Sequence, residues 1–415
     1  MRTEVRLWGR EVGILADDTG VSGIAFQYAP SWIADGFSIS PLQIPLVGGV
    51  QHNDEGRAFA GLFGVFADSL PDSWGQMLMD ERFRRAGLNP EMVGVLERLC
   101  HVGTRGWGAL SYRPERESAD EGLLEKMDIA EAERSMRAAV EGHMKDVLPQ
   151  VIESGASTGG ARPKQRIAIP PDAPDTVWYG KGVPPPGYEP WLLKIETDPH
   201  RQYGLVEEAY YRMARTAGIN VPDTRLVGAS SEGVQHFAIR RFDWLGEGRL
   251  HCHTLSGLLN RDSHAGSTDY DTFLRTILQV TGSQRDVQEA FRRMIFNVSF
   301  GVRDDHAKNH AFTMNTSGTW RLSPAYDVTY SRPGLGNGLH RQMAVQGKRR
   351  EISRDDISAM AETFGIGNRS LCQIFDTMHK AATGWQAISE ALGITTQRRD
   401  EIADTWEFPG PNLTW

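Results

Sequence analysis

The feature that most constrains the fold of this chain is a helical pattern that leads directly into an acidic loop. Apolar residues recur at helical spacing across residues 284–299, which predicts a helix with one face in the core. The loop that follows, residues 302–309, reads V-R-D-D-H-A-K-N. Because a core helix fixes the segment at its C-terminal end, Asp304 and Asn309 are expected at a rigid place in the fold.

A predicted hairpin then brings a third polar side chain to the same place. Residues 310–322 read as a strand, the turn N-T-S-G and a second strand, which is typical of a β-hairpin. A hairpin returns the chain to the edge of the sheet from which it left. Asp327 is therefore expected beside Asn309.

The spacing within the acidic loop is one that protein kinases use. Their pattern R-D-x-x-x-x-N corresponds here to Arg303, Asp304 and Asn309. In kinases the Asp faces the substrate hydroxyl and the Asn holds a metal ion, so Asp327 is the natural candidate for a second metal ligand. The alternative is a polar loop in which Asp304 and Asp305 cap an element, because short motif matches often arise by chance.

Length and charge limit the classes of protein to consider. A chain of 415 residues favours two or three domains, each large enough for its own core. The net charge is −8 and the sequence pI is about 5.9. Since a nucleic-acid backbone demands a basic face, an acidic chain is a poor general binder of DNA. Any contact with DNA is expected to be local or to be made through a partner.

Hydropathy and cysteine usage predict a cytoplasmic protein with no membrane partner. No run of about 18 apolar residues occurs, and the start M-R-T-E-V-R lacks an apolar signal region. Cys100, Cys252 and Cys372 are far apart and odd in number, so they imply no disulfide framework. The run His251-Cys252-His253 could suggest a metal site, but without a second cluster an ordinary strand or loop is the preferred interpretation.

The first part of the chain predicts a small antiparallel sheet followed by helices. Alternating apolar residues, broken by Gly and Asp, predict strands over 2–8, 11–16 and 22–28. A helix is expected within 66–83, with Pro71 in its first turn, and residues 103–112 read as a glycine-rich strand. A charged connection near 114–121 suggests a domain boundary within 115–148. Leu78 and Phe83 are expected to face the core.

A glycine-rich loop opens the next part. It runs from Gly155 to Lys164 and is followed by a strand. The Walker phosphate loop is excluded because Ala161 stands where that motif needs Lys, and the kinase pattern G-x-G-x-x-G is also absent. Such a loop can still bind phosphates through its backbone N–H groups; the alternative is a flexible connection between elements.

The elements after this loop follow the order of a kinase N-terminal lobe. Strands are predicted at 176–180, 191–196, 224–229 and 236–243, with a helix over 205–217 between the second and third strands. Lys194 lies in an apolar run, where a buried Lys is costly unless it has an anionic partner. The region 354–406 alternates helical patterns.

Several short motifs occur in order between about residues 6 and 330: L-W-G-R-E-V-G, F-A-D-S-L-P-D-S-W-G, G-W-G-A-L, S-T-G-G-A-R-P-K, W-L-L-K-I, R-R-F-D, D-D-H-A-K-N-H and L-S-P-A-Y-D. In this combination the chain resembles the HipA family, the kinase toxins of bacterial type II toxin–antitoxin pairs. The resemblance implies an α+β, protein-kinase-like two-lobe fold with a small N-terminal β-containing subdomain and a mainly helical C-terminal lobe. The expected divisions are 1–147 for the subdomain and connection, 148–243 for the kinase N-lobe, and 244–415 for the C-lobe.

The resemblance also assigns roles to individual residues. It implies that Asp304 is the catalytic Asp, that Asn309 and Asp327 bind Mg²⁺, and that Lys194 binds the ATP phosphates. Ser157 falls where the family has its autophosphorylated Ser. The remaining expected ATP-binding residues are in the glycine-rich loop, at the hinge that holds adenine, and beside the catalytic Asp: Gly159, Gly160, Lys164, Arg240, Phe242 and His306.

Two departures from the family pattern stand out. The family's loop reads G-A-Q-E-K where this chain reads G-A-R-P-K, so Arg162 and Pro163 change the charge and stiffness of the loop. Arg240 stands at the hinge where an acidic residue is common. Both departures bear on loop behaviour and substrate choice rather than on phosphoryl transfer.

The resemblance implies a function and partners that the residues alone do not show. It implies a serine/threonine kinase that uses ATP and Mg²⁺ and inhibits growth by phosphorylating a translation component, such as an aminoacyl-tRNA synthetase. It further implies a small helix-turn-helix antitoxin (HipB-like), with operator DNA bound mainly through that antitoxin. The alternatives are a small-molecule kinase of similar architecture and a non-catalytic co-repressor scaffold.

Overall fold

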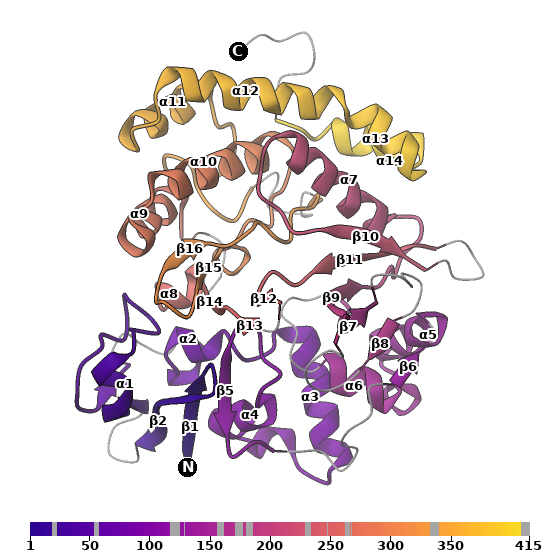
Figure 1. Cartoon of the computed structure of the whole chain (residues 1–415). Coiled ribbons are helices and arrows are strands. Elements are labelled where there is room, and N and C mark those ends of the chain that lie inside the picture. The colour runs from indigo at the N-terminus through magenta and orange to yellow at the C-terminus, as the bar shows by residue number, and fades with distance from the viewer. Residues whose placement is uncertain are drawn as a thin grey trace. The chain divides into compact units, whose positions relative to one another are not determined.

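The structure is a computed structural model of the whole chain (Figure 1). It describes residues 1–18, 23–53, 58–116, 125–127, 129–155, 162–170, 177–179, 186–228, 234–246, 248–261, 266, 268–332 and 340–407. The chain divides into two compact units. The first comprises residues 1–197, 225–261 and 313–319, and the second comprises residues 198–224, 262–312 and 320–415.

The first unit begins with an antiparallel sheet in the order β4-β3-β2-β1-β5. Its strands are β1 (Arg2–Leu7), β2 (Arg10–Asp18), β3 (Gly23–Tyr28), β4 (Gln51–His52) and β5 (Leu110–Arg113). Alternate residues of β1 are buried, as expected for a sheet with one face in the core. The turn between β1 and β2 uses Gly9 with φ +76°, a conformation that glycine adopts without steric cost. The three predicted N-terminal strands are confirmed.

Four helices follow in this part of the chain: α1 (Pro30–Asp35), α2 (Gly64–Ala67), α3 (Ser73–Arg85) and α4 (Val95–Val102), with 3-10 turns η1 (Ala58–Gly61) and η2 (Pro90–Met92). Of these, α1 and α4 pack on the sheet. Leu78 and Phe83 of α3 are fully buried, as predicted. The prediction that Pro71 lies in the first turn is wrong. Asp72 takes the extended conformation of an N-cap, so α3 begins at Ser73 and Pro71 precedes the cap.

A second sheet of the first unit has the order β10-β11-β9-β7-β8-β6. Its strands are β6 (Glu125–Met127), β7 (Lys164–Ile169), β8 (Val177–Tyr179), β9 (Glu189–Lys194), β10 (Thr224–Val227) and β11 (His236–Arg240). Helices α5 (Ile129–Val140) and α6 (Pro149–Gly155) and the turn η3 (Met144–Asp146) belong to the same region. One core cluster joins α3, α5 and α6 to the strands, and includes Trp74, Met136 and Leu193. The predicted strands of this region occur, but β9 lies two residues earlier than predicted and β11 ends at Arg240 rather than at residue 243.

The run His251-Cys252-His253 lies in a short strand, as the preferred interpretation expected. The last elements of the first unit are β12 (Trp244–Leu245), β13 (Gly248–Arg249), β14 (His251–Thr254) and α8 (Leu255–Leu258). His253 is buried and lies 2.9 Å from Ser40 Oγ and 2.6 Å from Asp68 Oδ2. His251 is hydrogen-bonded to the Ile39 carbonyl, and burial lowers its pKa to about 4. Both imidazoles thus tie strands and loops of the first unit together.

The second unit is mainly helical. Its helices are α7 (Tyr203–Thr216), α9 (Tyr270–Thr281), α10 (Gln284–Ser299), α11 (Arg354–Thr363), α12 (Asn368–Thr383), α13 (Trp385–Leu392) and α14 (Thr396–Ala403). Helix α10 has the bounds that the apolar pattern predicted. It starts where the Ser283 side chain accepts a hydrogen bond from the Asp286 N–H, and it packs against α9 and α12.

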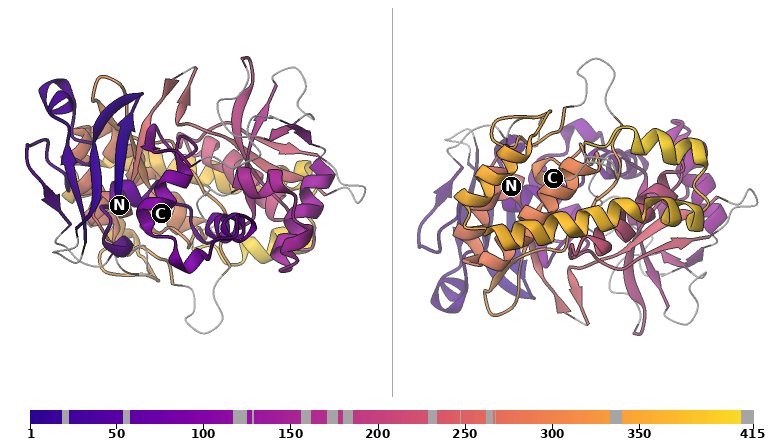
Figure 2. Two further views of the ribbon diagram at one scale, coloured as in Figure 1. Left: turned by 90° about the horizontal axis from the view of Figure 1, so that it is seen from below. Right: turned by 90° about the horizontal axis from the view of Figure 1, so that it is seen from above.

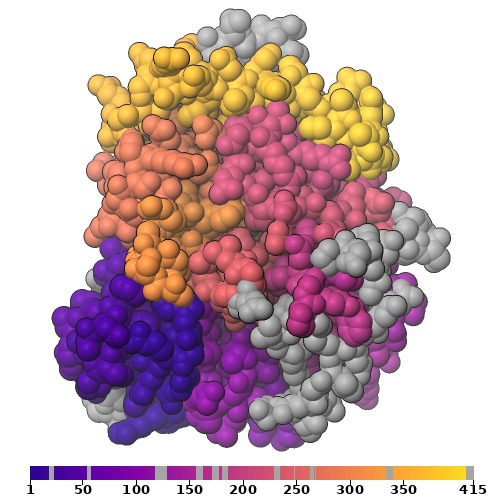
Figure 3. Space-filling model, in the orientation of Figure 1, coloured from indigo at the N-terminus to yellow at the C-terminus, as the bar shows by residue number. Residues whose placement is uncertain are grey.

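The C-terminal helices form a layer over the core of the second unit. Helices α12 and α13 pack on α7, and α12 also contacts α10 (Figures 1 and 2). In the space-filling view, the yellow residues of α11 to α14 form one continuous layer (Figure 3). Ser353 and Asp356 make a reciprocal capping box at the start of α11. This layer covers the helix that delivers the acidic loop.

The acidic loop is followed by the predicted hairpin. A 3-10 turn, η4 (Ala307–Asn309), leads into β15 (Ala311–Met314) and β16 (Trp320–Leu322), which are neighbours in a small sheet. Asn315 closes the turn between them, because its side chain accepts hydrogen bonds from the backbone N–H groups of Ser317 and Thr319. The hairpin prediction is confirmed.

Candidate active site

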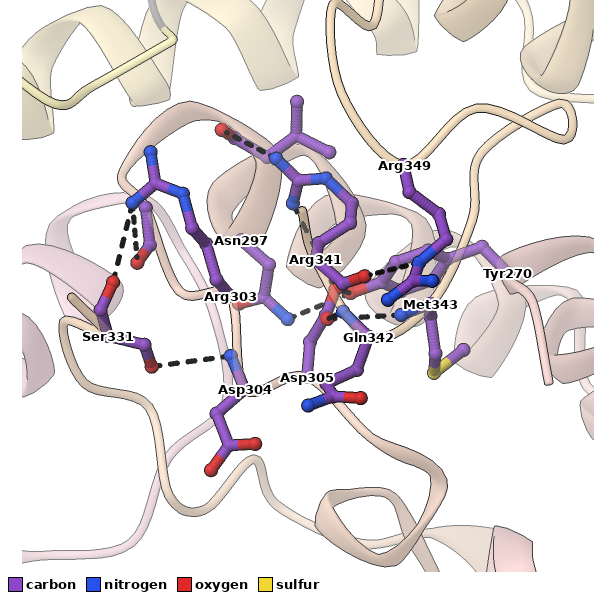
Figure 4. A network of polar contacts seen from close by, with 12 residues as sticks. Tyr270, Asn297, Arg303, Asp304, Asp305, Ser331, Arg341, Gln342, Met343 and Arg349 are labelled. Atoms are coloured by element: carbon purple, nitrogen blue, oxygen red, sulfur yellow. Dashed lines mark hydrogen bonds and ion pairs between the residues drawn. The ribbon is translucent and has the colours of Figure 1, made fainter. Parts of the chain in front are cut away.

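Two neighbouring aspartates of the acidic loop have opposite environments. The Asp304 side chain is 58% exposed, whereas that of Asp305 is fully buried. Figure 4 shows Asp304 pointing away from the polar network that receives Asp305. Only an exposed carboxylate can meet a substrate hydroxyl. Asp304 is therefore the residue of this pair that is available for chemistry.

A pocket in the second unit brings the predicted catalytic and metal-binding residues together. Asp304, Asn309 and Asp327 all contribute to its wall. The other lining residues come from the segment after α7, from α10, from the acidic loop and the residue after it, and from residues 325–328: Ile219, Arg293, Asn297, Val302, Asp305, His310, Ala325, Tyr326 and Val328. Segments that are well separated in the sequence thus meet in one small concave site.

The Asn309 amide is oriented by the loop itself. Its Nδ2 donates a hydrogen bond of 2.8 Å to the Asp304 carbonyl, and its backbone N–H donates to the His306 carbonyl at 2.8 Å. This use of the amide nitrogen leaves Oδ1 as the atom available to a cation. His306 also faces the loop, since its Nε2 lies 3.9 Å from Asp304 Oδ1.

Asp327 is brought to the loop by its neighbour in the chain. The Tyr326 hydroxyl donates a hydrogen bond of 2.5 Å to the Lys308 carbonyl, which joins the segment after the hairpin to η4. Asp327 itself has φ +56°, in the left-handed region that non-glycine residues seldom occupy. Strained backbone of this kind is concentrated at functional sites. Tyr211 lies close by, and its pKa is raised by burial and by the charges of Glu207 and Asp327.

The donor set in the pocket suits Mg²⁺. Within the described part of the chain there is no group of three or more His, Cys, Asp or Glu side chains placed to hold a metal ion. Mg²⁺ does not need such a group, because it is usually held by one or two carboxylates together with waters and substrate phosphates. The oxygens of Asn309 and Asp327 would supply the protein's share of that shell.

Asp305 anchors a second segment to the acidic loop. Its Oδ1 accepts hydrogen bonds from the Gln342 N–H at 2.9 Å and the Met343 N–H at 3.2 Å, and its Oδ2 accepts one from the Tyr270 hydroxyl at 2.8 Å (Figure 4). Arg341 Nη1 lies 4.0 Å from the same carboxylate. Burial raises the pKa of Asp305 more strongly than Arg341 and these hydrogen bonds lower it. Asp305 thus holds this segment in place, while the Asp304 side chain is exposed.

In the first unit the structure pairs two of the predicted phosphate-binding residues. Lys164 of β7 and Lys194 of β9 are directly opposite each other in the register of the two strands. Residues in register point to the same face of a sheet, and like charges directly opposite each other repel. A phosphate bound beside this pair would meet both positive charges. The backbone at Lys164 is held by Trp74, whose Nε1–H donates to its carbonyl at 2.9 Å.

The predicted hinge is an ordered segment at the end of β11. The Arg241 N–H donates to the Pro190 carbonyl at 2.9 Å. Arg240 points toward Glu189, with its Nη2 3.0 Å from Oε1, and the Phe242 ring packs edge-on against Trp107. Arg240, which stands where the family commonly has an acidic residue, thus has a carboxylate partner on the neighbouring strand β9. Gly159, Gly160 and Ser157, by contrast, lie outside the described residues.

Some residues that shape the site carry no recognisable signal in the sequence. Arg341 and Tyr270 lie far from the motif, and neither belongs to a pattern of known spacing. Arg303 belongs to the motif, yet its buried side chain points away from the pocket. The contrast between the two aspartates is also not evident from the motif. A possible signal is the second charge in the run D-D, since a buried Asp requires specific partners.

The fold of the chain is similar to that of a solved protein. The structure is similar to HipA from Shewanella oneidensis MR-1, solved as a complex of HipA, HipB and operator DNA, with a TM-score of 0.70 and 18% identity. The match covers 97% of this chain and 96% of that chain. It confirms the predicted α+β, kinase-like fold class.

The sequence itself places the chain in a family. Residues 156–385 match the model of the HipA-like C-terminal domain, and residues 3–113 match that of the HipA N-terminal domain. The chain belongs to the HipA family, as the motifs predicted.

Curated relatives match part of the chain. "Putative kinase Y4dM" of Sinorhizobium fredii is 26% identical over 54% of this chain and 57% of its own length. A "Putative kinase" of Haemophilus influenzae is 28% identical over 45% of this chain and 56% of its own length. The chain therefore spans a little over half the length of these relatives. Among the described residues, no helix combines the length and apolar character needed to cross a membrane.

Proposed function

We propose that this protein is an ATP-dependent serine/threonine protein kinase that acts as the toxin of a toxin–antitoxin pair. The observation that carries the proposal is the pocket in which Asp304, Asn309 and Asp327 meet. Phosphoryl transfer depends on positioning and on neutralising phosphate charge more than on covalent chemistry by the enzyme. An exposed carboxylate beside two oxygen donors for a cation is suited to that task.

Each residue has a distinct role in this proposal. Asp304 orients the Ser or Thr hydroxyl and accepts its proton late in the reaction. Asn309 and Asp327 hold Mg²⁺, which when bound neutralises charge on the ATP phosphates. Lys194 and Lys164 place fixed positive charge beside the phosphates, while the backbone around Arg240 and Phe242 receives adenine. His306 and the loop glycines Gly159 and Gly160 complete the nucleotide site.

The partners follow from family membership and from the solved relative. The Shewanella protein was solved with HipB and operator DNA, which supports a small helix-turn-helix antitoxin as partner here. The net charge of −8 supports contact with DNA mainly through that antitoxin. The proposed substrate is a protein of the translation machinery in the cytoplasm, whose phosphorylation would stop growth and favour persistence.

The test is transfer of labelled phosphate. Purified protein is incubated with radiolabelled ATP and Mg²⁺ in a cell lysate, and the products are separated by size. A labelled protein band supports the proposal. Label found only in small molecules would select a small-molecule kinase instead, and no transfer at all would select a non-catalytic scaffold for the antitoxin. The intact set of Lys194, Asp304, Asn309 and Asp327 disfavours the scaffold.

A prediction for the metal site concerns Asp327. Asp327→Ala should weaken Mg²⁺-dependent nucleotide binding by about tenfold or more, since even outer-shell partners of metal ligands cost that much. Nucleotide affinity measured by calorimetry with and without Mg²⁺ gives the effect. Asp376→Ala, an exposed aspartate on α12, is the matched control. If Asp327→Ala binds Mg²⁺–ATP as tightly as the unaltered protein, the second ligand lies elsewhere.

A prediction for regulation concerns Ser157. Phosphorylation there would add about −1.5 to −2 charges in the loop expected to bind the ATP phosphates. The added charge would compete with the nucleotide for the same backbone N–H groups, so we expect autophosphorylation to switch the enzyme off. Mass spectrometry after incubation with ATP locates the phosphate, and Ser157→Asp is assayed for ATP binding. Phosphate found only outside residues 154–158, or normal ATP binding by Ser157→Asp, contradicts this prediction.

A further inference from the structure

The arginine of the R-D motif does not face the pocket. Arg303 is 4% exposed, and it is absent from the pocket wall. Its Nη2 donates a hydrogen bond of 2.6 Å to the Thr405 carbonyl and lies 3.8 Å from Glu407 Oε1. Its Nη1 donates to the carbonyls of Gly301 and Ser331, both at 3.4 Å. The Arg303 side chain thus joins the acidic loop, proposed here as the catalytic loop, to residues 405–407.

A second buried arginine shares the same carboxylate. Arg341 is fully buried, and its Nη2 lies 2.8 Å from Glu407 Oε1. The other side of its guanidinium faces Asp305, which directly follows Asp304 in the catalytic loop (Figure 4). Two guanidinium groups and two carboxylates therefore form one cluster, with Glu407 on one side and Asp305 on the other.

The segment that carries Glu407 is firmly docked on the second unit. Trp406 packs against Phe300 and Trp385, with ring centroids 4.9 Å and 5.5 Å apart, and its Nε1–H donates to the Tyr210 hydroxyl at 3.1 Å. The Glu407 N–H donates to the carbonyl of Ser299, the last residue of α10, at 3.1 Å. Aromatic packing and hydrogen bonds of this kind fix the carboxylate in place rather than leaving it to solvent.

We propose that Glu407 is a positioning residue that holds the catalytic loop in its active geometry through Arg303. In many kinases the active arrangement is ordered by an arginine pairing with a phosphorylated residue of the activation loop. Here a carboxylate of the protein's own C-terminal segment supplies the anion permanently. The catalytic loop is therefore built to be ordered without a phosphate at that place. This inference rests on the proposed kinase function.

The path from Glu407 to the reacting group is short. Arg303 precedes Asp304 in the chain and donates to the Ser331 carbonyl, while the Ser331 Oγ accepts a hydrogen bond of 3.3 Å from the Asp304 N–H (Figure 4). Burial lowers the pKa of Arg303, and the charge of Glu407 opposes that effect. Without Glu407, the two buried guanidinium groups of Arg303 and Arg341 would lose the carboxylate that lies near both, while Asp305 would remain beside Arg341. Their repulsion would displace Arg303 and, with it, the backbone of Asp304.

The expected consequence is a loss of turnover without a loss of nucleotide affinity. A displacement of about 1 Å at a reacting group can cost about 10²-fold in rate. In the described part of the second unit, the contacts of Glu407 are with Arg303, Arg341 and the Ser299 carbonyl, and neither proposed metal ligand is among them. We therefore expect Glu407→Gln to lower kcat for phosphate transfer by about tenfold to a hundredfold, while KM for ATP stays within about twofold.

The experiment compares three variants of the full chain. Glu407→Gln removes the charge, Glu407→Asp retains it and should recover most of kcat, and Glu390→Gln is the control, since Glu390 is an exposed carboxylate that also pairs with an arginine. For each variant, kcat and KM for ATP are measured below the unfolding transition, with the nucleotide-binding fraction determined by titration. That fraction separates turnover per active site from loss of folded protein.

The outcomes separate this inference from the proposed function. If the unaltered protein transfers no phosphate to any acceptor, the proposed function fails. If it does, and Glu407→Gln keeps full kcat per binding site, the positioning role is refuted and the kinase assignment stands. A variant that loses kcat and ATP affinity together, with no recovery in Glu407→Asp, also refutes the role, because a general structural defect then explains the loss.

Discussion

Asp304→Asn should abolish most phosphate transfer while leaving ATP binding intact. The substitution keeps the shape of the side chain but removes the anionic acceptor for the hydroxyl proton. General-base positioning of this kind contributes about 10²–10⁴ in rate. Because the Asp304 side chain is 58% exposed, the change should leave the fold unaffected. Growth inhibition and labelled phosphate transfer should fall together.

The control for this prediction is a charge change of the same kind elsewhere. Asp376→Asn removes one exposed carboxylate on α12 and should alter neither transfer nor growth inhibition. Affinity for ATP is measured in both variants to show that the nucleotide site is intact. Full toxicity in Asp304→Asn would show that another group accepts the proton.

The helix that delivers the site could be predicted from sequence because its signal is local. The apolar residues of α10 recur at helical spacing, Ser283 caps its start, and the structure gives the bounds that the pattern predicted. The hairpin had an equally local signal in the turn at Asn315. Together these elements determine where Asp304, Asn309 and Asp327 lie. The amino-acid sequence alone was therefore enough to nominate these three residues.

Other features depend on contacts between distant parts of the chain, which no local pattern records. Asp305 accepts a hydrogen bond from the backbone of Gln342, which lies 37 residues later in the chain. Arg303 pairs with Glu407, which lies more than a hundred residues later. The start of α3 was misjudged for a different reason. Pro71 is favourable in a first helical turn, but the backbone of Asp72 is extended, so the helix begins only at Ser73.

The pair of lysines opposite each other on β7 and β9 combines a local signal with a contact between distant parts of the chain. Each lysine had a sequence signal, Lys164 at the end of a glycine-rich loop and Lys194 in an apolar strand. Their pairing depends on the register of β7 and β9, which is set by the hydrophobic pattern of the sheet and by its other strands. Sequence could nominate both residues for phosphate binding. Only the structure shows that they are directly opposite each other.

The largest effect on stability is expected at Asp305. Asp305→Ala would remove the acceptor for the Tyr270 hydroxyl and for two backbone N–H groups, and would leave the buried Arg341 with Glu407 as its remaining carboxylate. Removing one partner of a buried ion pair typically costs about 3–5 kcal/mol. Here three donors would lose their acceptor, and Arg341 would lose one of the two carboxylates that offset its charge. We expect a loss of that size in the free energy of unfolding, measured by urea denaturation.

A second substitution separates the effect of the lost ion pair from the effect of the lost hydrogen bonds. In the double variant Asp305→Ala/Arg341→Met the guanidinium that lost one of its two carboxylates is also removed, and replacing both members of a buried pair by apolar groups is often close to neutral. The double variant should therefore be more stable than Asp305→Ala alone. Asp271→Ala, which breaks an exposed pair with Arg275 on α9, should change stability little. If Arg341→Met restores no stability to Asp305→Ala, the cost of Asp305→Ala comes from its lost hydrogen bonds to Tyr270 and the backbone. The ion pair then contributes little to holding the acidic loop.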